Sequence, residues 1–236
     1  MGSDTSDATS QDDLTRRGLV GMAQRGSEIE MGNPTVWGLI SDVHGNYPAL
    51  EEALRVLSAA GATRLAFLGD YLGRGDSDRC VQRIREVADV AIVGNRDLDW
   101  QDRVSAASKA WVLGLPRTAC VGRLLLSHGD ARLTAGLSTT QIGRDFLRPW
   151  QEMERANAQV WAFGHSHHAR TWRKAASAAP AEMLGSGSIE MDPTYRYFVN
   201  VGTTGLPFPG KGGPSVAVVD FHNAQVRHMA LESVAK

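Results

Sequence analysis

The chain has 236 residues, and 42% of them are hydrophobic, which is enough to bury one large core. Its formal net charge of -1 excludes binding to nucleic acid or to an anionic membrane by overall charge alone. The sequence contains neither an apolar stretch of the roughly 20 residues that span a bilayer nor a signal peptide. We therefore expect a cytoplasmic protein without a membrane partner or a stable nucleic-acid partner; the sequence does not specify an oligomeric state.

Residues 1–33 differ in composition from the rest of the chain. They are rich in Ser, Thr, Asp and Gly, a composition typical of a flexible segment. Patterns of buried strands and amphipathic helices begin directly after them. We therefore predict a flexible N-terminal tail over residues 1–33 and one α/β domain over residues 34–236.

The first part of this domain alternates strands with helices. In chain order we predict a strand at Val36–Ile40, a helix at Pro48–Ala60, a strand at Arg64–Leu68, a helix at Ser77–Val87 and a strand at Val90–Val93. Pro48 suits the first turn of its helix, Gly61 suits its end, and Ser77 can cap the next helix. This order implies parallel strands with right-handed crossovers, so ligands should gather beyond the carboxyl ends of the strands.

The second part of the domain has a more mixed pattern. Here we predict a helix over residues 98–113, a strand at Arg123–Leu126, a helix over residues 139–156 and a strand at Val160–Phe163. The final predicted strands, separated by turns, are Tyr197–Val201, Ser215–Phe221 and Gln225–Glu232. Consecutive short strands with turns favour antiparallel pairing, so we expect a second sheet.

Five short motifs with oxygen or imidazole side chains follow the predicted strands. They are Asp42-Val43-His44, Gly69-Asp70, Gly94-Asn95-Arg96-Asp97, Ser127-His128-Gly129-Asp130 and Gly164-His165-Ser166-His167. In an extended segment, residues two apart point to the same side, so Asp42 and His44 could bind one ion, as could His165 and His167. Such ligands suit Mn, Fe or Zn. One such motif alone is more often a turn or a helix cap, but five in order indicate a two-metal hydrolase site.

As a set, these motifs resemble those of the calcineurin-like metallophosphoesterase superfamily, over about Thr35 to Phe221. The resemblance implies a two-sheet mixed β-sandwich flanked by helices, in four layers, and a pair of divalent metal ions. By position, one ion would take Asp42, His44, Asp70 and His167, and the other would take Asp70, Asn95, His128 and His165. In that family a hydroxide held by both ions attacks phosphorus in line. The segment Asn200-Val201-Gly202-Thr203 further resembles the bacterial single-domain, phosphodiesterase-like branch.

The chain departs from the family pattern at its proton donor. Many members carry a histidine directly after the motif asparagine, where this chain has Arg96, and arginine cannot deliver a proton. In phosphoprotein phosphatases an aspartate orients that histidine, where this chain has Gly73. General acid assistance contributes about 10² to 10⁴ in rate, so its absence favours substrates with acidic leaving groups. Arg74 and Arg96 could then hold phosphoryl oxygens, although Arg74 could instead form a salt bridge with Asp76 or Asp78.

The sequence therefore predicts a metal-dependent hydrolase of phosphoric esters or anhydrides. We expect a phosphodiesterase or dinucleoside-polyphosphate hydrolase that acts on a phosphorylated small molecule or nucleotide, with Asp70, Arg74 and Arg96 as catalytic residues. A phosphomonoesterase or phosphoprotein phosphatase is the alternative enzyme. The alternative outside enzymes is a non-catalytic scaffold of the same fold that binds partner proteins. A scaffold would be expected to have lost metal-ligand side chains or to expose a large apolar patch.

Residues around the motifs give further predictions. Asp97 and Asp130 are expected to orient ligand imidazoles or to cap turns. His168 is expected to be exposed, with substrate contact as the alternative, and His222 and His228 are expected to be exposed. Trp100 is the tryptophan that we expect nearest the cleft, where it could stack on a nucleobase, whereas the other tryptophans suit the core.

Overall fold

Two six-stranded sheets form the body of the domain. The computed structural model describes residues 35–129 and 146–232. The first sheet consists, in spatial order, of β3 (Val90–Ala91), β2 (Arg64–Phe67), β1 (Val36–Ile40), β11 (Ser215–Asp220), β12 (Gln225–Ala230) and β9 (Ser188–Glu190). The second consists of β4 (Thr118–Val121), β5 (Leu124–Ser127), β6 (Val160–Phe163), β10 (Arg196–Asn200), β7 (Arg170–Lys174) and β8 (Glu182–Gly185). The predicted fold class, a sandwich of two mixed sheets with flanking helices, is confirmed.

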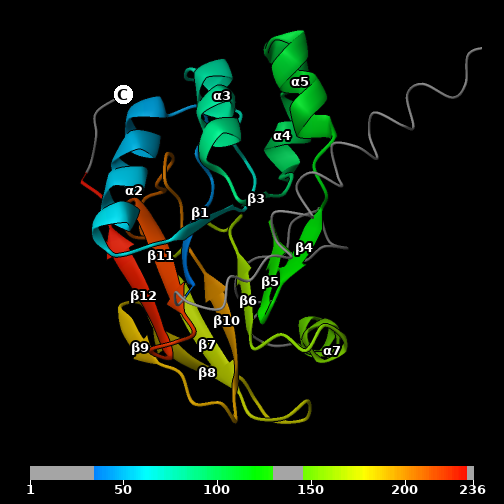
Figure 1. Ribbon diagram of the computed structural model, residues 1–236, viewed down its shortest axis with the longest axis vertical. Coiled ribbons are helices and arrows are strands. Elements are labelled where there is room, and N and C mark those ends of the chain that lie inside the picture. The colour runs from blue at the N-terminus through cyan, green and yellow to red at the C-terminus, as the bar shows by residue number, and fades with distance from the viewer. Residues whose placement is uncertain (1–34, 130–145, 233–236) are drawn as a thin grey trace, which may run out of the picture. The chain divides into compact units, whose positions relative to one another are not determined.

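Helices cover the outer faces of both sheets (Figure 1). They are α2 (Tyr47–Ala59), α3 (Ser77–Val87), α4 (Asn95–Asp99), the 3-10 helix η1 (Gln101–Arg103), α5 (Ala106–Leu113) and α7 (Leu147–Arg155). One apolar cluster joins α2, α3 and α5 to the first sheet, and a second lies between the sheets, where it includes Leu39 and Ala162. A third joins α7 to the second sheet through Trp150 and Trp161. These three clusters define the four layers.

Parallel pairing brings the ends of the motif-bearing strands together. β1 pairs in parallel with β2, and β5 pairs in parallel with β6, so within each pair the carboxyl ends share one edge. Backbone hydrogen bonds join the loops beyond these ends: Asp42 N donates to Gly69 O at 3.0 Å, and Gly164 N donates to His128 O at 2.9 Å. The loops that carry the motifs are therefore fixed to one another.

The start of α3 differs from the prediction. Asp76, and not Ser77, caps this helix, because Asp76 Oδ1 accepts a hydrogen bond from Arg79 N at 3.2 Å. The hydroxyl of Ser77 is engaged elsewhere, since it accepts from Gly73 N at 3.0 Å. Ser77 thus ties the loop after β2 to the first turn of the helix.

The single helix predicted over residues 98–113 is wrong. The structure has three shorter helices there, α4, η1 and α5, with a break at Val104 and Ser105. Ser105 caps α5, and its hydroxyl donates to Asp78 Oδ1 at 2.6 Å, so this contact with α3 fixes the break. Strand β3 is also shorter than predicted, and β7, β8 and β9 were not predicted.

The C-terminal strands divide between the two sheets. β11 and β12 are antiparallel, as predicted, but they extend the first sheet. β10 belongs to the second sheet, where it is parallel to β6 and antiparallel to β7. The predicted second sheet is confirmed, but of these strands only β10 belongs to it, because the chain crosses from one sheet to the other after β10.

One prediction lies wholly, and another partly, outside the described residues. These are the tail over residues 1–33 and the beginning of the helix predicted over residues 139–156, of which the structure shows α7. Over residues 35–129 and 146–232, no helix combines the length and the apolar character that a membrane crossing requires.

Candidate metal centre

Left-handed backbone conformations mark the motif loops. Seven non-glycine residues of the described chain have positive φ, and five of them are predicted metal ligands: Asp42, His44, Asp70, His165 and His167. Such conformations are unfavourable for L-residues and concentrate at functional sites. We predicted that Asp42 and His44 lie on one extended segment and that His165 and His167 lie on another. Their positive φ values show that this prediction is wrong. Asp42 and His44 converge through a tight turn, whereas His167 lies with Asp42 and His44, and His165 lies with Asn95 and His128.

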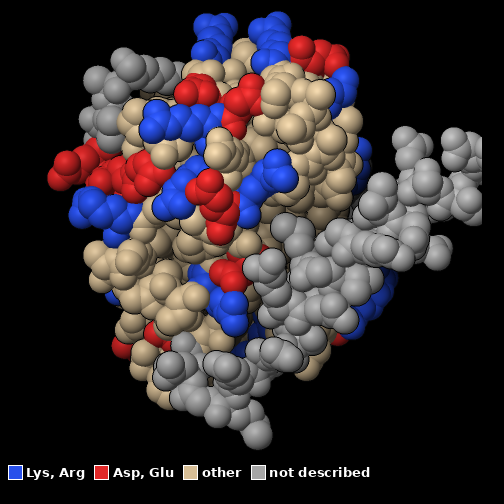
Figure 2. All heavy atoms as spheres, turned by 45° about the horizontal axis from the view of Figure 1, so that its top comes forward, with Lys and Arg blue, Asp and Glu red and all other residues tan. Residues whose placement is uncertain are grey.

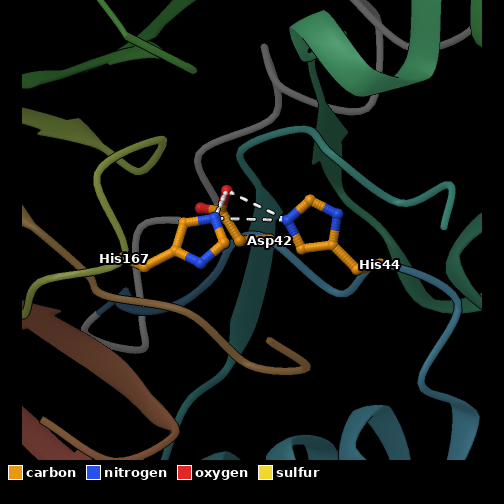
Figure 3. A group of neighbouring side chains, drawn as sticks. All are labelled: Asp42, His44 and His167. Carbon is orange, nitrogen blue, oxygen red and sulfur yellow. Dashed lines mark hydrogen bonds and ion pairs between the residues drawn. The ribbon is translucent and has the colours of Figure 1, made fainter. Parts of the chain in front are cut away.

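The first group of neighbouring ligand atoms joins Asp42, His44 and His167 (Figure 3). His167 Nε2 lies 3.0 Å from Asp42 Oδ1 and 3.2 Å from His44 Nε2, and His44 Nε2 lies 3.6 Å from the same Asp42 oxygen. All three side chains are buried. The arrangement places two imidazole nitrogens and one carboxylate oxygen around a common point.

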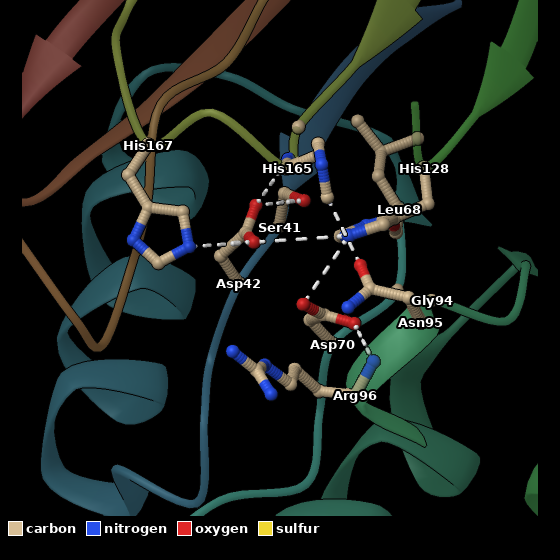
Figure 4. A network of polar contacts seen from close by, with 12 residues as sticks. Ser41, Asp42, Leu68, Asp70, Gly94, Asn95, Arg96, His128, His165 and His167 are labelled. Carbon is tan, nitrogen blue, oxygen red and sulfur yellow. Dashed lines mark hydrogen bonds and ion pairs between the residues drawn. The ribbon is translucent and has the colours of Figure 1, made fainter. Parts of the chain in front are cut away.

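The second group joins Asp42, Asp70 and His128 (Figure 4). His128 Nε2 lies 3.2 Å from Asp70 Oδ2 and 4.0 Å from Asp42 Oδ1. His44 Nε2 lies 3.9 Å from the same Asp70 oxygen, so the two groups are contiguous. Asp42 belongs to both groups, whereas the family pattern implies that Asp70 is the shared ligand.

Asn95 and His165 adjoin the second group. Asn95 Oδ1 and His165 Nδ1 are 2.9 Å apart, and the His165 ring lies edge-on to the His128 ring with 5.3 Å between centroids. The backbone N of His165 donates to Asp42 Oδ2 at 3.0 Å. The structure thus brings all seven predicted ligands into one region.

Backbone carbonyls fix two of the imidazoles. The Nδ1 atoms of His128 and His167 lie 2.7 Å from Leu68 O and 2.6 Å from Leu206 O. A carbonyl oxygen only accepts hydrogen bonds, so Nδ1 carries a proton in each ring. When such a ring is neutral, its Nε2 atom has a free lone pair, and this lone pair points at the carboxylates. A hydrogen bond of this kind orients histidine ligands in metal sites.

Burial and charge shift the pKa values of the central groups strongly. Burial would by itself lower the pKa of His128, but the carboxylates of Asp70 and Asp42 raise it to about 10. Burial would raise the pKa of Asp42, but the charge of His128 and polar contacts with His167 and His44 hold it well below its usual value. Without bound ions the centre therefore keeps anionic carboxylates beside a protonated histidine, and a cation that binds here would displace that proton.

Two buried atoms at the centre form no hydrogen bond of good geometry among the described residues, although ionic neighbours lie 3.0 to 4.0 Å from them. They are Asp42 Oδ1 and His128 Nε2. Leaving a buried polar atom unpaired is costly, and such atoms require an explanation. A carboxylate oxygen and an imidazole nitrogen are both good ligands for Mn, Fe or Zn. The residues present therefore fit a divalent metal site.

Asp97 organises the loop after β2, a role that the sequence predicts only in part. Its buried carboxylate accepts hydrogen bonds from four backbone nitrogens, those of Asp70, Tyr71, Leu72 and Gly94, at 2.7 to 3.0 Å. The sequence left two roles open for Asp97, orienting an imidazole ligand or capping a turn. The structure shows the second, because all four hydrogen bonds come from backbone nitrogens. The other residue given this role, Asp130, lies outside the described residues.

Arg74 and Arg96 are both exposed. The backbone N of Arg96 donates to Asp70 Oδ1 at 2.7 Å, and its guanidinium lies 3.6 Å from Asp99. In the described part of the chain Arg74 forms no salt bridge with Asp76 or Asp78, which bind Arg79 N and Ser105 instead. The structure thus gives Arg74 no structural role among these residues.

Three predictions about neighbouring residues need correction. His168 is only half-buried, and its Nε2 accepts a hydrogen bond from Arg170 Nε at 3.0 Å. His228 is also half-buried, with Nε2 3.0 Å from Asn200 O. Trp100 packs against the cluster under α2, α3 and α5 and beneath the Arg103 guanidinium.

The aromatic residue that contacts the candidate centre is Phe208. Its ring lies parallel to that of His167, with 4.4 Å between centroids and 14° between planes. Phe208 is not predicted from the sequence because it lies in a Pro- and Gly-rich turn segment without periodicity. The available signal was its closeness to Asn200-Val201-Gly202-Thr203.

Comparison with known proteins agrees with this geometry. The family model for the calcineurin-like phosphoesterase superfamily domain matches residues 36–224, so the chain belongs to this family. An uncharacterized protein of Methanocaldococcus jannaschii is 22% identical over 219 residues, which cover 82% of this chain and 86% of that protein. The crystal structure of a metallophosphoesterase from Sphaerobacter thermophilus matches with a TM-score of 0.70 and 22% identity over 86% of this chain and 90% of that one. The structure of an archaeal phosphodiesterase matches with a TM-score of 0.50 and 14% identity over 84% of this chain and 100% of that one.

Proposed function

We propose that this chain is a hydrolase of phosphoric esters or anhydrides that depends on two divalent metal ions. One observation carries the proposal: buried carboxylate oxygens and imidazole nitrogens form two contiguous groups, and within each group the ligand atoms lie within 4.8 Å of one another. A bound cation offsets the cost of burying these carboxylates together. The proposed metals are Mn, Fe or Zn, which carboxylate and imidazole ligands suit.

The proposed ligands form two sets. Asp42, His44, Asp70 and His167 would hold one ion, and Asp70, Asn95, His128 and His165 would hold the other. When bound, the ions would supply an activated water and positive charge for the phosphoryl oxygens. The chain itself contributes rigidity, because Leu68 O, Leu206 O and Arg96 N each fix one ligand through a hydrogen bond.

The geometry at Gly73 favours substrates with acidic leaving groups. A Cβ atom at this position would lie 2.1 Å from His44 O, so no side chain fits here without moving His44. The aspartate that orients an acid histidine in phosphoprotein phosphatases therefore has no room on this backbone, and Arg96 cannot deliver a proton. Aryl, nucleotide and polyphosphate leaving groups need a proton least. We therefore favour a phosphodiesterase or a dinucleoside-polyphosphate hydrolase.

Arg74 and Arg96 are proposed to bind the substrate. Both side chains are exposed next to the loops that carry the ligands, and a guanidinium binds phosphoryl oxygens through two parallel hydrogen bonds. The face shown in Figure 2 carries interspersed basic and acidic side chains without an extended region of one sign. The chain's net charge of -1 gives no overall attraction for a long polyanion, so the proposed substrate is a phosphorylated small molecule or nucleotide.

A hydrolysis screen tests this proposal. Wild type with added Mn, Fe or Zn would be assayed on bis(p-nitrophenyl) phosphate, dinucleoside polyphosphates, cyclic nucleotides, alkyl phosphomonoesters and phosphopeptides. We expect the diesters and anhydrides to react fastest and the Asp70→Asn variant to be inactive. Asp102→Asn, which changes an exposed carboxylate paired with Lys109, is the matched control and should retain activity.

The screen also separates the alternatives. Faster turnover of alkyl phosphomonoesters or phosphopeptides would favour a phosphomonoesterase or phosphoprotein phosphatase. A wild type that is inactive with every metal would favour the non-catalytic scaffold. Against the scaffold stands the fact that every predicted ligand position holds a side chain able to bind a metal.

A further inference from the structure

The segment between β10 and β11 is attached to the candidate metal centre. Its Gly205 N donates to Asp42 O at 2.9 Å, and Gly205 O accepts from Asn46 Nδ2 at 3.1 Å. The next residue, Leu206, supplies the carbonyl that binds His167 Nδ1. A Cβ at Gly205 would lie 1.8 Å from Val43 O, so this close approach requires glycine.

A tight turn then presents an aromatic and a basic residue together. Lys211 N donates to Phe208 O at 3.1 Å, Pro209 follows Phe208, and Gly210 has φ of +77°. Proline at the second position and a glycine with positive φ at the third are typical of a type II turn. With Pro207 on its other side, the backbone of Phe208 is restricted, so little conformational freedom would be lost when a ligand binds against it.

Phe208 remains 44% exposed although its ring stacks on His167. A single exposed apolar residue is ordinary on a protein surface. Here, however, the ring is held parallel to a proposed metal ligand. A planar group of a substrate bound at the metal centre would therefore meet an aromatic surface directly beside the reacting phosphate.

Two basic side chains contact the residues on either side of His167. Lys211 Nζ donates to Ser166 O at 3.2 Å, and Arg170 Nε donates to His168 Nε2 at 3.0 Å. Within residues 35–129 and 146–232 neither basic side chain has an acidic partner, so both charges are available to an anion.

We propose that Phe208, Lys211 and Arg170 form a subsite beside His167 for a nucleoside polyphosphate. The base stacks on Phe208, and Lys211 and Arg170 hold a phosphate next to the one that reacts. This inference rests on the proposed function, because the metal centre defines which phosphate reacts. It narrows the substrate class from phosphoric esters and anhydrides in general to those that carry an aromatic base and more than one phosphate.

Binding measurements test the subsite independently of catalysis. Isothermal titration calorimetry would compare ADP, which has a base and two phosphates, with inorganic pyrophosphate, which has no base, each with and without Mn. We expect Phe208→Ala to weaken ADP binding roughly tenfold and to leave pyrophosphate binding unchanged, since stacking on one aromatic side chain accounts for about this factor. Phe208→Tyr retains the ring and should bind ADP as wild type does.

The basic residues have a different expected signature. Lys211→Met keeps the aliphatic chain and removes the charge, so it should weaken ADP and pyrophosphate alike, and Arg170→Met should do the same. A Phe208→Ala variant that loses ADP and pyrophosphate affinity equally would overturn the subsite and leave Phe208 as a cover for His167. Wild type that binds ADP no better than pyrophosphate would also overturn it.

The same experiment separates this inference from the proposed function. If wild type binds ADP in the expected pattern but hydrolyses no phosphoric ester or anhydride, the subsite holds and the hydrolase proposal fails. If wild type hydrolyses bis(p-nitrophenyl) phosphate but Phe208→Ala leaves ADP binding unchanged, the hydrolase proposal holds and the subsite fails.

Discussion

Asp97 and Asp70 are joined by a hydrogen bond in which Asp97 Oδ2 accepts from Asp70 N at 2.9 Å. Asp70 comes from the loop after β2, and Asp97 comes from α4, so this bond connects two motifs that are 27 positions apart in sequence. Because Arg96 N also donates to Asp70 Oδ1, both the backbone and the side chain of Asp70 are fixed from α4. The position of the proposed shared ligand thus depends on a residue that does not itself belong to the ligand set.

Replacing Asp97 with alanine should therefore affect both stability and metal binding. The change leaves four buried backbone N–H groups without their acceptor, and we expect a loss of about 3 kcal/mol or more in the free energy of unfolding. Urea unfolding with and without Mn measures the effect. Asp99→Ala, which changes an exposed neighbour on the same helix, is the control, and equal stabilities of the two variants would contradict the role given to Asp97.

Gly73→Ala should weaken metal binding without replacing a ligand. The added methyl group would overlap His44 O, so the loop that carries His44 must shift, at a cost of about 2 kcal/mol. Gly213→Ala is a matched control, because a Cβ there meets nothing within 4 Å. Titration calorimetry with Mn compares the two variants, and unchanged Mn affinity in Gly73→Ala would show that the contact is unimportant.

Arg96→Ala separates the two contributions of this residue. Its backbone N still holds Asp70, so Mn binding should remain at the wild-type level. The guanidinium is removed, so KM for a diester should rise roughly tenfold through loss of a charge-assisted hydrogen bond. A variant with wild-type KM would remove Arg96 from the substrate site.

His228 should make the metal-free protein less stable at low pH. Burial lowers the pKa of His228 to about 4 from the 6.5 of a free histidine, so between these values the unfolded chain binds the extra proton. The free energy of unfolding is therefore highest above pH 6.5. It decreases by up to about 3 kcal/mol as the pH falls from 6.5 to about 4. Urea unfolding across this range should show a weaker pH dependence in His228→Gln than in wild type, whereas His222→Gln, an exposed control, should match wild type.

The sequence predicted those parts of the molecule that depend on local pattern. Strands β1, β2 and β6 follow from short apolar runs, and the proposed ligands follow from motifs at the ends of such runs. The left-handed turns at Asp42 and His44 were missed because they are set by bonds to a distant loop, such as His44 N to Asp70 O at 2.9 Å. Phe208 was missed for the same reason, since its position depends on contacts with His167 and on a turn that no periodicity marks.

The break in the helix predicted over residues 98–113 has a similar origin. Local apolar spacing favours one continuous helix there, but Asp78 on α3 binds both the backbone N and the hydroxyl of Ser105. A capping interaction with a neighbouring helix thus prevails over local helix propensity.

The number of metal ions that the chain binds tests the central claim most directly. Purified wild type would be stripped of metal, dialysed against Mn and analysed for metal content by mass spectrometry, in parallel with Asp70→Asn and the control Asp102→Asn. We predict two Mn ions per chain for wild type and for Asp102→Asn, and at most one for Asp70→Asn. Wild type that retains no Mn, or that binds the same amount as Asp70→Asn, would contradict the two-metal centre.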